Sequence, residues 1–424
     1  MIDVLLGLQW GDEGKGKIAD YFTRHYDIVF RWQGGANAGH TIYIDGKPLA
    51  LHHIPSGIFN PKAMNIIGNL CVVNPPSLMR ELAGLKKAVP DAAKRLLIGE
   101  RTSMLIPTHK LLDALEEYQK GKNKVGSTLQ GITPCYRDLV GRVGLRMALI
   151  RESYFKKEYA RLSGIHIATL RKTPFGRKLL RGLPALEKEF FASITQIKNK
   201  LQIVSAEHYL REALARGKHI LAEGAQGTML DLVYGSYPNV TSSHTVAGSM
   251  FVGGGVPPQS LGRVYGVFKA YVTKVGSGPF PTKLDNEIGE RIRQEGREFG
   301  ATTGRPRDCG WLDLVALKEA CALDGVTNLV MTKADILSNF KEVKVAIGYK
   351  RGGKMVKTFP LSLAGIEPVY ATFKGWNGDI SKIKTYGKLP KPLRDYIAFI
   401  EKYVGVPVSH IATGPERSQL IVRK

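Results

Sequence analysis

One segment near the start of the chain has the residue types of a phosphate-binding loop. Residues 11–17 contain three glycines and two lysines in the spacing Gly-x-x-x-x-Gly-Lys, directly after a short apolar run. Such glycines let backbone N–H groups turn inward around phosphate oxygens, and the lysines offset the phosphate charge. Ile18 stands where a Ser or Thr ligand of Mg²⁺ usually follows. We therefore expect Asp12, a carboxylate inside the loop, to hold the metal instead.

A second glycine-rich segment contains an imidazole. Residues 33–41 place glycines and alanines around Asn37 and end in His40 and Thr41. A lone histidine is often a hydrogen-bonded structural residue, but beside a second glycine-rich loop it can donate to charge that develops on a transferred group. His40 is therefore a candidate catalytic residue.

Two later loops have the chemistry to recognise a base and a carboxylate. Residues 332–335 read Thr-Lys-Ala-Asp after an apolar run, and the Asp335 carboxylate can accept two hydrogen bonds from guanine but not from adenine. Residues 300–305 combine small backbone, two hydroxyls and the Arg305 guanidinium, which suits bidentate binding of a carboxylate. These loops indicate a guanine nucleotide and an acidic small molecule as ligands.

The elements that must position these loops alternate between strands and helices. Apolar runs predict strands over 4–8, 28–32, 65–68, 219–222, 264–271 and 329–332. Amphipathic spacing predicts helices over 17–24, 111–118 and 184–200. This alternation favours an α/β fold with a large central, mostly parallel sheet flanked by helices, in which ligands bind where the strands end. We expect one domain over 1–424, with a mainly helical insertion at about 101–200.

Composition and charge limit the class of protein. The 424 residues are 43% apolar, which excludes disorder as the main state. The formal charge is +24, and residues 151–220 and 341–424 supply most of it, with 15 basic and 6 acidic residues in the first segment and 16 and 6 in the second. We interpret the basic cluster at 171–181 as a solvated surface and do not expect nucleic-acid binding, because interleaved aromatic residues are missing.

The N-terminus and the cysteines indicate a compartment. The first residues lack a basic leader and a cleavage site, and no apolar run is long enough to span a membrane. The four cysteines lie far apart, without the spacing of a zinc site. We expect a cytoplasmic protein that does not enter a membrane.

The ordered motifs of the chain resemble those of the adenylosuccinate synthetase family. The resemblance rests on QWGDEGKGK at 9–17, GGANAGHT at 34–41, HIPSGI at 53–58, IIGN at 66–69, EGAQGTMLD at 223–231, YPNVTSS at 237–243, KAYVTKVGSGPFPT at 269–282, GATTGRPRDCGWLD at 300–313, TKAD at 332–335 and TGPER at 413–417. It implies a homodimer that ligates IMP and L-aspartate with GTP and Mg²⁺, through 6-phosphoryl-IMP, to give adenylosuccinate, GDP and phosphate. This reaction is the first committed step from IMP to AMP.

The resemblance also implies a role for individual residues. The catalytic residues would be Asp12, His40 and Lys15, with Asp12 and the Gly39 carbonyl as Mg²⁺ ligands. GTP would be bound by Gly11, Asp12, Glu13, Gly14, Lys15, Gly16, Lys17, Gly39, His40, Thr41, Arg307, Lys333, Ala334, Asp335, Ala412, Thr413 and Gly414. IMP would be bound by Asp12, Glu13, Gly14, Lys15, Asn37, Ala38, Gly39, His40, Thr128, Gln226, Thr241, Arg305 and, across the dimer interface, Arg142. L-aspartate would be bound by Ala301, Thr302, Thr303, Gly304 and Arg305.

Some residues depart from the family pattern, and two other functions stay open. Leu129, Gln130 and Thr133 replace residues common in the loop that carries Thr128, and Asp308 stands where a basic residue is frequent. One alternative is an aspartate ligase that acts on a 2-aminopurine deoxynucleotide such as dGMP, although by resemblance such relatives lack the carboxylate of Asp12. The other alternative is a relative that binds GTP or nucleic acid without catalysis.

Overall fold

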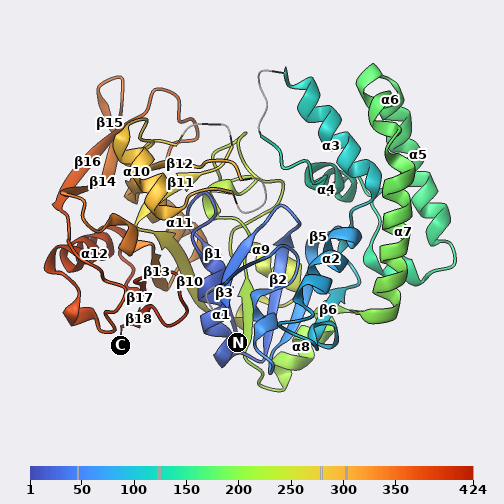
Figure 1. Ribbon diagram of the computed structural model, residues 1–424, viewed down its shortest axis with the longest axis horizontal. Coiled ribbons are helices and arrows are strands. Elements are labelled where there is room, and N and C mark those ends of the chain that lie inside the picture. The colour runs from blue at the N-terminus through green and yellow to red at the C-terminus, as the bar shows by residue number, and fades with distance from the viewer. Residues whose placement is uncertain (45–46, 122–125, 277, 279, 301–303, 424) are drawn as a thin grey trace.

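Parallel strands that alternate with helices form the centre of the molecule (Figure 1). The structure is a computed structural model that describes residues 1–44, 47–121, 126–276, 278, 280–300 and 304–423. The largest sheet has 11 strands, and all its pairings are parallel except that of β17 with β18. In spatial order these are β18 (Leu420–Val422), β17 (Val408–Ala412), β13 (Asn328–Thr332), β10 (Leu261–Lys269), β1 (Ile2–Gly7), β9 (Ile220–Glu223), β2 (Ile28–Gly34), β5 (Met64–Val73), β6 (Leu96–Gly99) and β8 (Gln202–Val204), while β7 (Ser103–Met104) pairs with β5. The predicted α/β fold is therefore confirmed.

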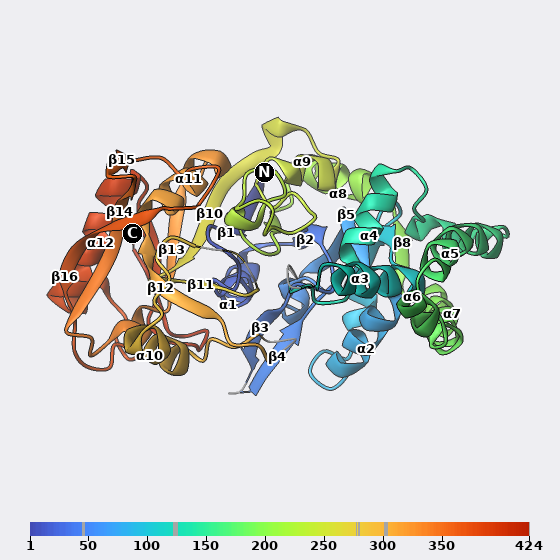
Figure 2. The same ribbon diagram turned by 90° about the horizontal axis from the view of Figure 1, so that it is seen from above.

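Helices cover both faces of the central sheet, as a parallel sheet requires. Along β1, Val4 and Leu6 belong to one hydrophobic cluster, whereas Leu5 belongs to another. The first cluster includes residues of α8 (Ala206–Ala215), α9 (Ser249–Gly254), α11 (Leu314–Asp324) and α12 (Lys391–Val404), and the second includes residues of α1 (Lys15–Phe22). Figure 2 shows α8 and α9 on one side of the sheet and α1 on the other. Both faces of β1 are thus packed against helices, which fixes the strand that precedes the loop at 8–14.

The chain leaves the central sheet at Ala270. The sequence predicts one strand over 264–271, but β10 ends at Lys269 and Tyr271 begins β11 (Tyr271–Lys274) in a second sheet. The Gln9 amide accounts for the break, because its Nε2 donates to the carbonyls of Lys269 (3.3 Å) and Tyr271 (3.0 Å). The second sheet continues with β12 (Asp308–Asp313), β14 (Glu342–Arg351), β15 (Lys354–Val356) and β16 (Glu367–Lys374), and β3 (His40–Ile44) and β4 (Lys47–Leu51) form a separate hairpin.

A group of helices lies at one end of the molecule in both views (Figures 1 and 2). It consists of α3 (Pro107–Gln119), α4 (Ile132–Val140), α5 (Phe155–Arg171), α6 (Pro174–Leu180) and α7 (Leu183–Lys200). The predicted helix over 111–118 begins earlier, at Pro107, since proline is tolerated in a first turn and the Ile106 N–H donates to His109 Nδ1 (3.0 Å). The remaining helices are α2 (Pro75–Leu85), which contacts α7, and α10 (Glu287–Gly296) beside β12. A single domain with one insertion stays a prediction.

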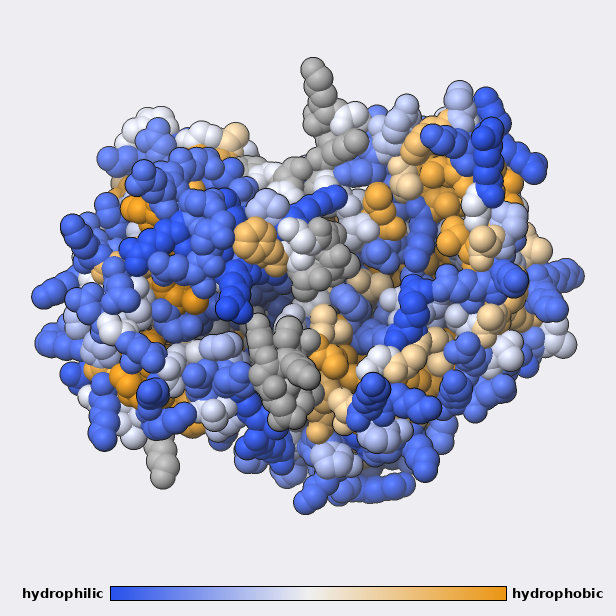
Figure 3. All heavy atoms as spheres, viewed as in Figure 1, coloured by the Kyte–Doolittle hydropathy of each residue, from blue (hydrophilic) through white to orange (hydrophobic). Residues whose placement is uncertain are grey.

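The surface differs between the two ends of the molecule. Figure 3 shows mostly hydrophilic residues over the half that carries α10, α12 and β14–β16, whereas hydrophobic residues appear among the helices of the other half. Exposed large hydrophobic residues there include Tyr118, Tyr154 and Ile165. No helix among the described residues is long and apolar enough to cross a membrane.

Helix α9 approaches β2 so closely that only glycine fits at the contact. A Cβ at Gly253 would lie 2.6 Å from the carbonyl oxygen of Trp32 and 2.7 Å from its Cβ. The Trp32 indole N–H also donates to Ser249 Oγ in α9 (2.8 Å), which fixes the helix against the strand. The packing of α9 therefore depends on the absence of a side chain at Gly253.

We expect Gly253→Ala to destabilise the protein by about 1–3 kcal/mol, because strand and helix must separate to admit the methyl group. Thermal unfolding followed by circular dichroism measures the effect. Gly248→Ala is the matched control, since nothing lies within 4 Å of a Cβ there. Equal melting temperatures for the two variants would show that the contact has no importance for stability.

Candidate active site

The loop between β1 and α1 is organised around the Glu13 carboxylate. Glu13 is fully buried, and its Oε1 accepts from the N–H groups of Gln9 (3.1 Å) and Gly11 (2.9 Å). Its Oε2 accepts from Lys15 Nζ (2.6 Å). A Cβ at Gly227 would collide with the same carboxylate. The loop predicted to bind phosphate is thus held in shape by its own acidic residue, and the Lys15 ammonium is paired with Glu13.

Asp12 points to a different partner. Its Oδ2 forms an ion pair with Arg307 Nε (2.9 Å), and Arg307 Nη1 donates to Glu298 Oε2 (2.6 Å). The Asp12 side chain is about one third exposed, whereas Glu298 is fully buried. Arg307, predicted to contact GTP, therefore links the exposed carboxylate of the loop to a buried one behind it.

His40 is oriented by a buried glutamate. Its Nδ1 contacts Glu223 at the end of β9, and the same carboxylate accepts from Ser56 N–H (2.7 Å) and Ser56 Oγ (2.8 Å). Burial alone would raise the pKa of Glu223, but the charges of His40 and Arg31 and the hydrogen bonds bring it to about 2. Because an ionised carboxylate only accepts, the proton of the neutral imidazole must be on Nδ1. Burial lowers the pKa of His40 itself.

Three segments distant in sequence meet at the start of α1. Lys17 Nζ donates to the carbonyls of Gly414 and Gln419, the latter at 2.9 Å. Thr332 Oγ1 donates to the Glu13 carbonyl (2.6 Å). Burial lowers the pKa of Lys17 to about 8 and raises the pKa of Asp335. The predicted phosphate loop, the Thr-Lys-Ala-Asp loop and the loop after β17 therefore form one site, as expected for the carboxyl ends of parallel strands.

The loop that carries Thr128 is suspended from α3. Asp113 Oδ2 accepts from Gly131 N–H (2.8 Å), and Glu117 Oε1 accepts from the N–H groups of Gly126 (2.7 Å) and Ser127 (3.2 Å). A Cβ at Gly131 would lie 2.8 Å from backbone atoms of α3. Two carboxylates of one helix thus hold the backbone of this loop.

The residues that depart from the family pattern have partners. Thr133 Oγ1 lies 2.6 Å from Ser242 Oγ, and this contact joins α4 to the segment 237–243. Gln130 Nε2 donates to the Thr128 carbonyl (3.4 Å). Asp308 pairs with Lys283 at 3.3 Å. The side chains of Gln130, Thr133 and Asp308 therefore each have a partner in the structure.

Several predicted site residues have buried polar atoms without a hydrogen-bond partner. They are Asn37 Oδ1, His40 Nε2, Thr413 Oγ1 and both amide atoms of Gln226. Buried polar groups are normally satisfied, so such atoms mark places where a ligand or water completes the bonding. They come from three different segments of the chain, 34–41, 223–231 and 413–417, and each of these segments was assigned to the site from sequence.

Non-glycine residues with a left-handed backbone are frequent at the site. Asp12 (φ 59°), Gln226 (φ 58°) and Lys333 (φ 61°) adopt this conformation, as do Leu129 and Arg142 in the region of α4. Each such residue costs about 1 kcal/mol or more relative to glycine. Glycine would avoid this cost but would leave these turns without a side chain.

The other predicted residues are distributed as follows. Gly14 and Gly16 lie at the start of α1, Ala38 and Gly39 precede β3, Thr41 lies within β3, and Ala334 lies after β13. The Thr241 N–H donates to Leu230 O (2.8 Å), and Arg305 Nη1 donates to the Gly126 carbonyl (3.0 Å), which brings the loop ending at Gly304 and Arg305 to the Thr128 loop. Ala301, Thr302 and Thr303 lie outside the described residues. Arg142 is exposed, and no described contact joins it to the phosphate loop.

Sequence reasoning missed the acidic residues that support the site. Glu223 ends an otherwise apolar strand, β9. Glu298 is the partner of Lys269, a charged residue at the buried end of β10. A charged residue inside a buried run needs a partner, and this requirement is the signal that identifies them. The partner itself, however, is distant in the sequence.

Three comparisons relate the chain to known proteins. The family model described as Adenylosuccinate synthetase matches residues 4–421. Proteins named adenylosuccinate synthetase from Flavobacterium johnsoniae and Christiangramia forsetii are 48% and 47% identical over 424 residues, covering 100% of each chain. The solved structure of a fully ligated adenylosuccinate synthetase from Plasmodium falciparum has a TM-score of 0.92 and 35% identity, and the match covers 100% of this chain and 99% of that one.

A more distant structure shares the fold alone. It is a succinoaminodeoxyadenylate synthetase of cyanophage S-2L bound to dGMP and dATP, with 17% identity and a TM-score of 0.63. The match covers 99% of this chain and 95% of that one. Identity at this level carries no information about the substrate of the present chain.

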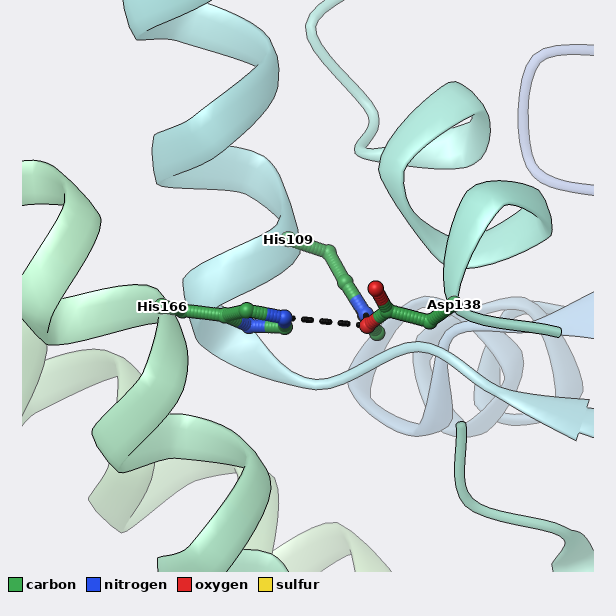
Figure 4. A group of neighbouring side chains, drawn as sticks. All are labelled: His109, Asp138 and His166. Atoms are coloured by element: carbon green, nitrogen blue, oxygen red, sulfur yellow. Dashed lines mark hydrogen bonds and ion pairs between the residues drawn. The ribbon is translucent and has the colours of Figure 1, made fainter. Parts of the chain in front are cut away.

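Outside this site, three helices share a cluster of titratable side chains (Figure 4). His109 of α3 and His166 of α5 direct Nε2 at Asp138 Oδ2 of α4, at 2.8 and 2.9 Å. The residue types suit a metal ion, but the Ile106 N–H donates to His109 Nδ1. The proton of neutral His109 is therefore on Nε2, and Nε2 cannot be a metal ligand while it donates to Asp138. We interpret the cluster as a hydrogen-bonded link between helices.

We expect Asp138→Ala to lower the free energy of unfolding by about 3 kcal/mol, because two buried imidazole N–H groups lose their acceptor. Glu116→Ala is the control, since the exposed Arg137–Glu116 pair joins α3 and α4, two of the three helices, and contributes less than about 1 kcal/mol. Thermal unfolding with and without EDTA tests the metal. A melting temperature that falls with EDTA and recovers with zinc would contradict the hydrogen-bonded interpretation.

Proposed function

Since this chain belongs to the adenylosuccinate synthetase family, we propose that the site around Asp12 and His40 performs the family's reaction with the residues described above. The protein is a GTP-dependent ligase of purine biosynthesis that converts IMP and L-aspartate to adenylosuccinate. The observation that carries the residue assignment is the set of unpartnered buried atoms on Asn37, His40, Gln226 and Thr413. These atoms are the donors and acceptors that two nucleotides need.

Asp12 is the proposed base for IMP. The hypoxanthine O6 is a poor leaving group, so N1 must lose its proton as O6 attacks the γ-phosphoryl group of GTP. GDP leaves, and the aspartate amine then displaces phosphate from C6. Asp12 suits proton removal because its carboxylate is partly exposed and held by Arg307 at 2.9 Å rather than by the loop backbone.

His40 is the proposed donor to the charge that develops on O6 or on the phosphoryl group. With Nδ1 directed at Glu223, only Nε2 is free to face a substrate. The neutral ring has its proton on Nδ1 and is an acceptor at Nε2, so donation requires a second proton on Nε2. The charge of Glu223 stabilises this imidazolium and opposes burial, which lowers the pKa of His40. Glu223 thus acts through His40 and contacts no substrate itself.

The guanine nucleotide would lie between the loops that meet at α1. Asp335 would accept from guanine N1–H and its amino group, and Thr413 Oγ1 is buried without a partner beside this region. Lys17 holds the Gly414 carbonyl and so ties the base loop to the phosphate loop. The Glu13-centred loop would present its remaining N–H groups to the phosphates, with the Lys15 ammonium held beside them by Glu13.

Mg²⁺ would be held by the Asp12 carboxylate and the Gly39 carbonyl. Both are hard oxygen donors next to the phosphate loop, and phosphate oxygens and water would complete the ligand set. The ion supplies charge stabilisation to the transferring phosphoryl group. Arg307 contacts Oδ2 of Asp12, and Oδ1 would be the metal ligand.

L-aspartate would bind at the loop 300–305. Arg305 reaches the Gly126 carbonyl, so this loop adjoins the loop of Thr128 that we assign to IMP. Such proximity suits attack of the amine on C6. The carboxylates of α3 fix the backbone on the IMP side, which would help to hold the two substrates in line.

We further propose a homodimer in which Arg142 reaches the IMP phosphate of the partner subunit. Arg142 is exposed at the end of α4 in a left-handed turn. Nearby in sequence, Val140 is 81% exposed, and Val233 and Tyr237 in the loop before Thr241 are also exposed. Large exposed hydrophobic residues are typical of surfaces that a partner covers.

We propose the cytoplasm as the compartment. All four cysteines are free and buried, which supports this proposal.

We expect purified protein to form adenylosuccinate from IMP, L-aspartate, GTP and Mg²⁺, and Asp12→Asn to lower kcat by about 10²–10⁴-fold. Product formation is followed by absorbance, with dGMP in place of IMP in a parallel reaction. Asp27→Asn is the control. Asp27 accepts from Lys218 Nζ and from the His219 N–H, and it precedes β2, whereas the segment that carries Asn37 and His40 follows β2. Product from dGMP alone would change the substrate, and GTP binding without turnover would support a binding function.

Mixing two inactive variants tests the shared site. We expect Arg142→Ala and Asp12→Asn each to be inactive alone, whereas their equimolar mixture recovers about a quarter of wild-type activity, because half the dimers are mixed and one of their two sites is intact. Light scattering with substrates bound gives the oligomeric state. A fully active Arg142→Ala variant, or a fully active monomer, would refute this assignment.

A further inference from the structure

Glu298 stands at the centre of a buried group of charges that we call the Glu298 cluster: Glu298, Lys269, Tyr271, Arg307 and Lys333. Lys269 Nζ donates to both carboxylate oxygens (3.0 Å each), and Tyr271 Oη donates to Oε1 (2.5 Å). Arg307 Nη1 donates to Oε2 (2.6 Å), and Lys333 Nζ lies 3.8 Å from Oε1. Glu298 and Lys269 have no exposed side-chain surface.

One carboxylate here faces three cations. Burial would raise the pKa of Glu298, but the charges of Lys269, Lys333 and Arg307 bring it down to about 2, so the carboxylate is ionised. Burial lowers the pKa of Lys269, which needs the carboxylate to stay charged. The second carboxylate in contact with the cluster is Asp12, through Arg307. Loss of the Glu298 charge therefore leaves Asp12 to balance Arg307 alone.

The three cations of the cluster belong to different segments of the chain, and two of these segments, those of Arg307 and Lys333, are assigned to substrates. Arg307 contacts Asp12 of the phosphate loop. Lys333 belongs to the guanine loop, and its Nζ also donates to the Gly296 carbonyl (2.7 Å). Lys269 ends β10, where the chain passes to the second sheet. Glu298 is the one side chain among the described residues that contacts all three.

Glu298 and Arg307 also join the two ends of the loop assigned to L-aspartate. The Arg307 N–H donates to the Glu298 carbonyl (2.9 Å), and a bridge pairs Phe299 with Pro306. The side-chain bond between Glu298 and Arg307 lies beside this backbone bond. The ends of the loop 299–306 are thus held together by two interactions between the same residues.

We propose that Glu298 is a positioning residue for the ligation: it holds Arg307 against Asp12 and keeps the aspartate loop and the guanine loop in register. It contacts no substrate and acts through Arg307 and Lys333. This inference rests on the proposed function for the identity of the ligands, and it goes beyond that function by assigning one buried carboxylate to the alignment of the L-aspartate and GTP sites. A purely structural ion pair would stabilise the fold without affecting the binding of any one ligand.

Steady-state kinetics of Glu298→Gln test the proposal. We expect kcat to fall about tenfold or more, and KM for L-aspartate and GTP to rise about tenfold, because misplaced groups lose alignment. KM for IMP should change less than about twofold, since Glu298 contacts none of the described residues assigned to IMP alone. Glu298→Asp keeps the charge and should recover part of the loss. Asp313→Asn, which alters another fully buried acid at the start of α11, is the matched control and should leave all KM values unchanged.

A double variant separates position from stability. Glu298→Gln leaves Lys269 buried without a counterion, so its melting temperature should fall, and Lys269→Met in the same chain should restore part of it. The raised KM values should remain, because Arg307 and Lys333 still lack the Glu298 carboxylate. KM values that recover with the melting temperature, or Glu298→Gln protein with unchanged KM for L-aspartate and GTP, would overturn the proposal.

Nucleotide binding distinguishes failure of this inference from failure of the proposed function. Calorimetric titration with GDP requires no turnover, and Glu298→Gln should weaken GDP binding about tenfold relative to Asp313→Asn. Inactive wild-type protein that shows this difference would leave the Lys333 part of the proposal standing and refute the ligase assignment. Equal GDP affinities in an active enzyme would refute the coupling to the guanine loop.

Discussion

Buried charge at the carboxyl edge of the central sheet requires compensation, and the site is built from the pairs that provide it. Glu13 pairs with Lys15 inside the phosphate loop, Glu223 with His40, and Glu298 with Arg307 and Lys269. In each case the buried glutamate contacts at least one side chain that we assign to the proposed site. The glutamates fix the orientation of those side chains before any ligand arrives, so little reorganisation is needed on binding.

The sequence was sufficient for the architecture and for the places of the candidate loops within it. Glycine spacing and the apolar runs identified β1, β2, β9 and β13 and the loops that follow them, because these signals are local. It was insufficient at Ala270, where the predicted strand divides between two sheets. The cause is the Gln9 amide, which is about 260 residues away in sequence and binds backbone groups on both sides of the break. No local pattern encodes that contact.

The supporting carboxylates show the same limit. Asp113 and Glu117 look like ordinary polar positions of an amphipathic helix, yet they accept the backbone N–H groups of the Thr128 loop. Asp138 fixes α3 and α5 through two imidazoles. Their functions depend on which loop folds back onto the helix, and this is a property of tertiary structure. The helices at this end of the molecule therefore support the backbone of the Thr128 loop.

The left-handed residues have an evolutionary consequence. Asp12, Gln226 and Lys333 occupy backbone conformations in which glycine would be more stable. Selection for heat resistance alone would favour glycine at these three positions, and each replacement would delete a side chain that we assign to a ligand. Thermostable descendants of this chain should therefore gain their stability elsewhere, in helix ends and surface loops, while these costly turns persist.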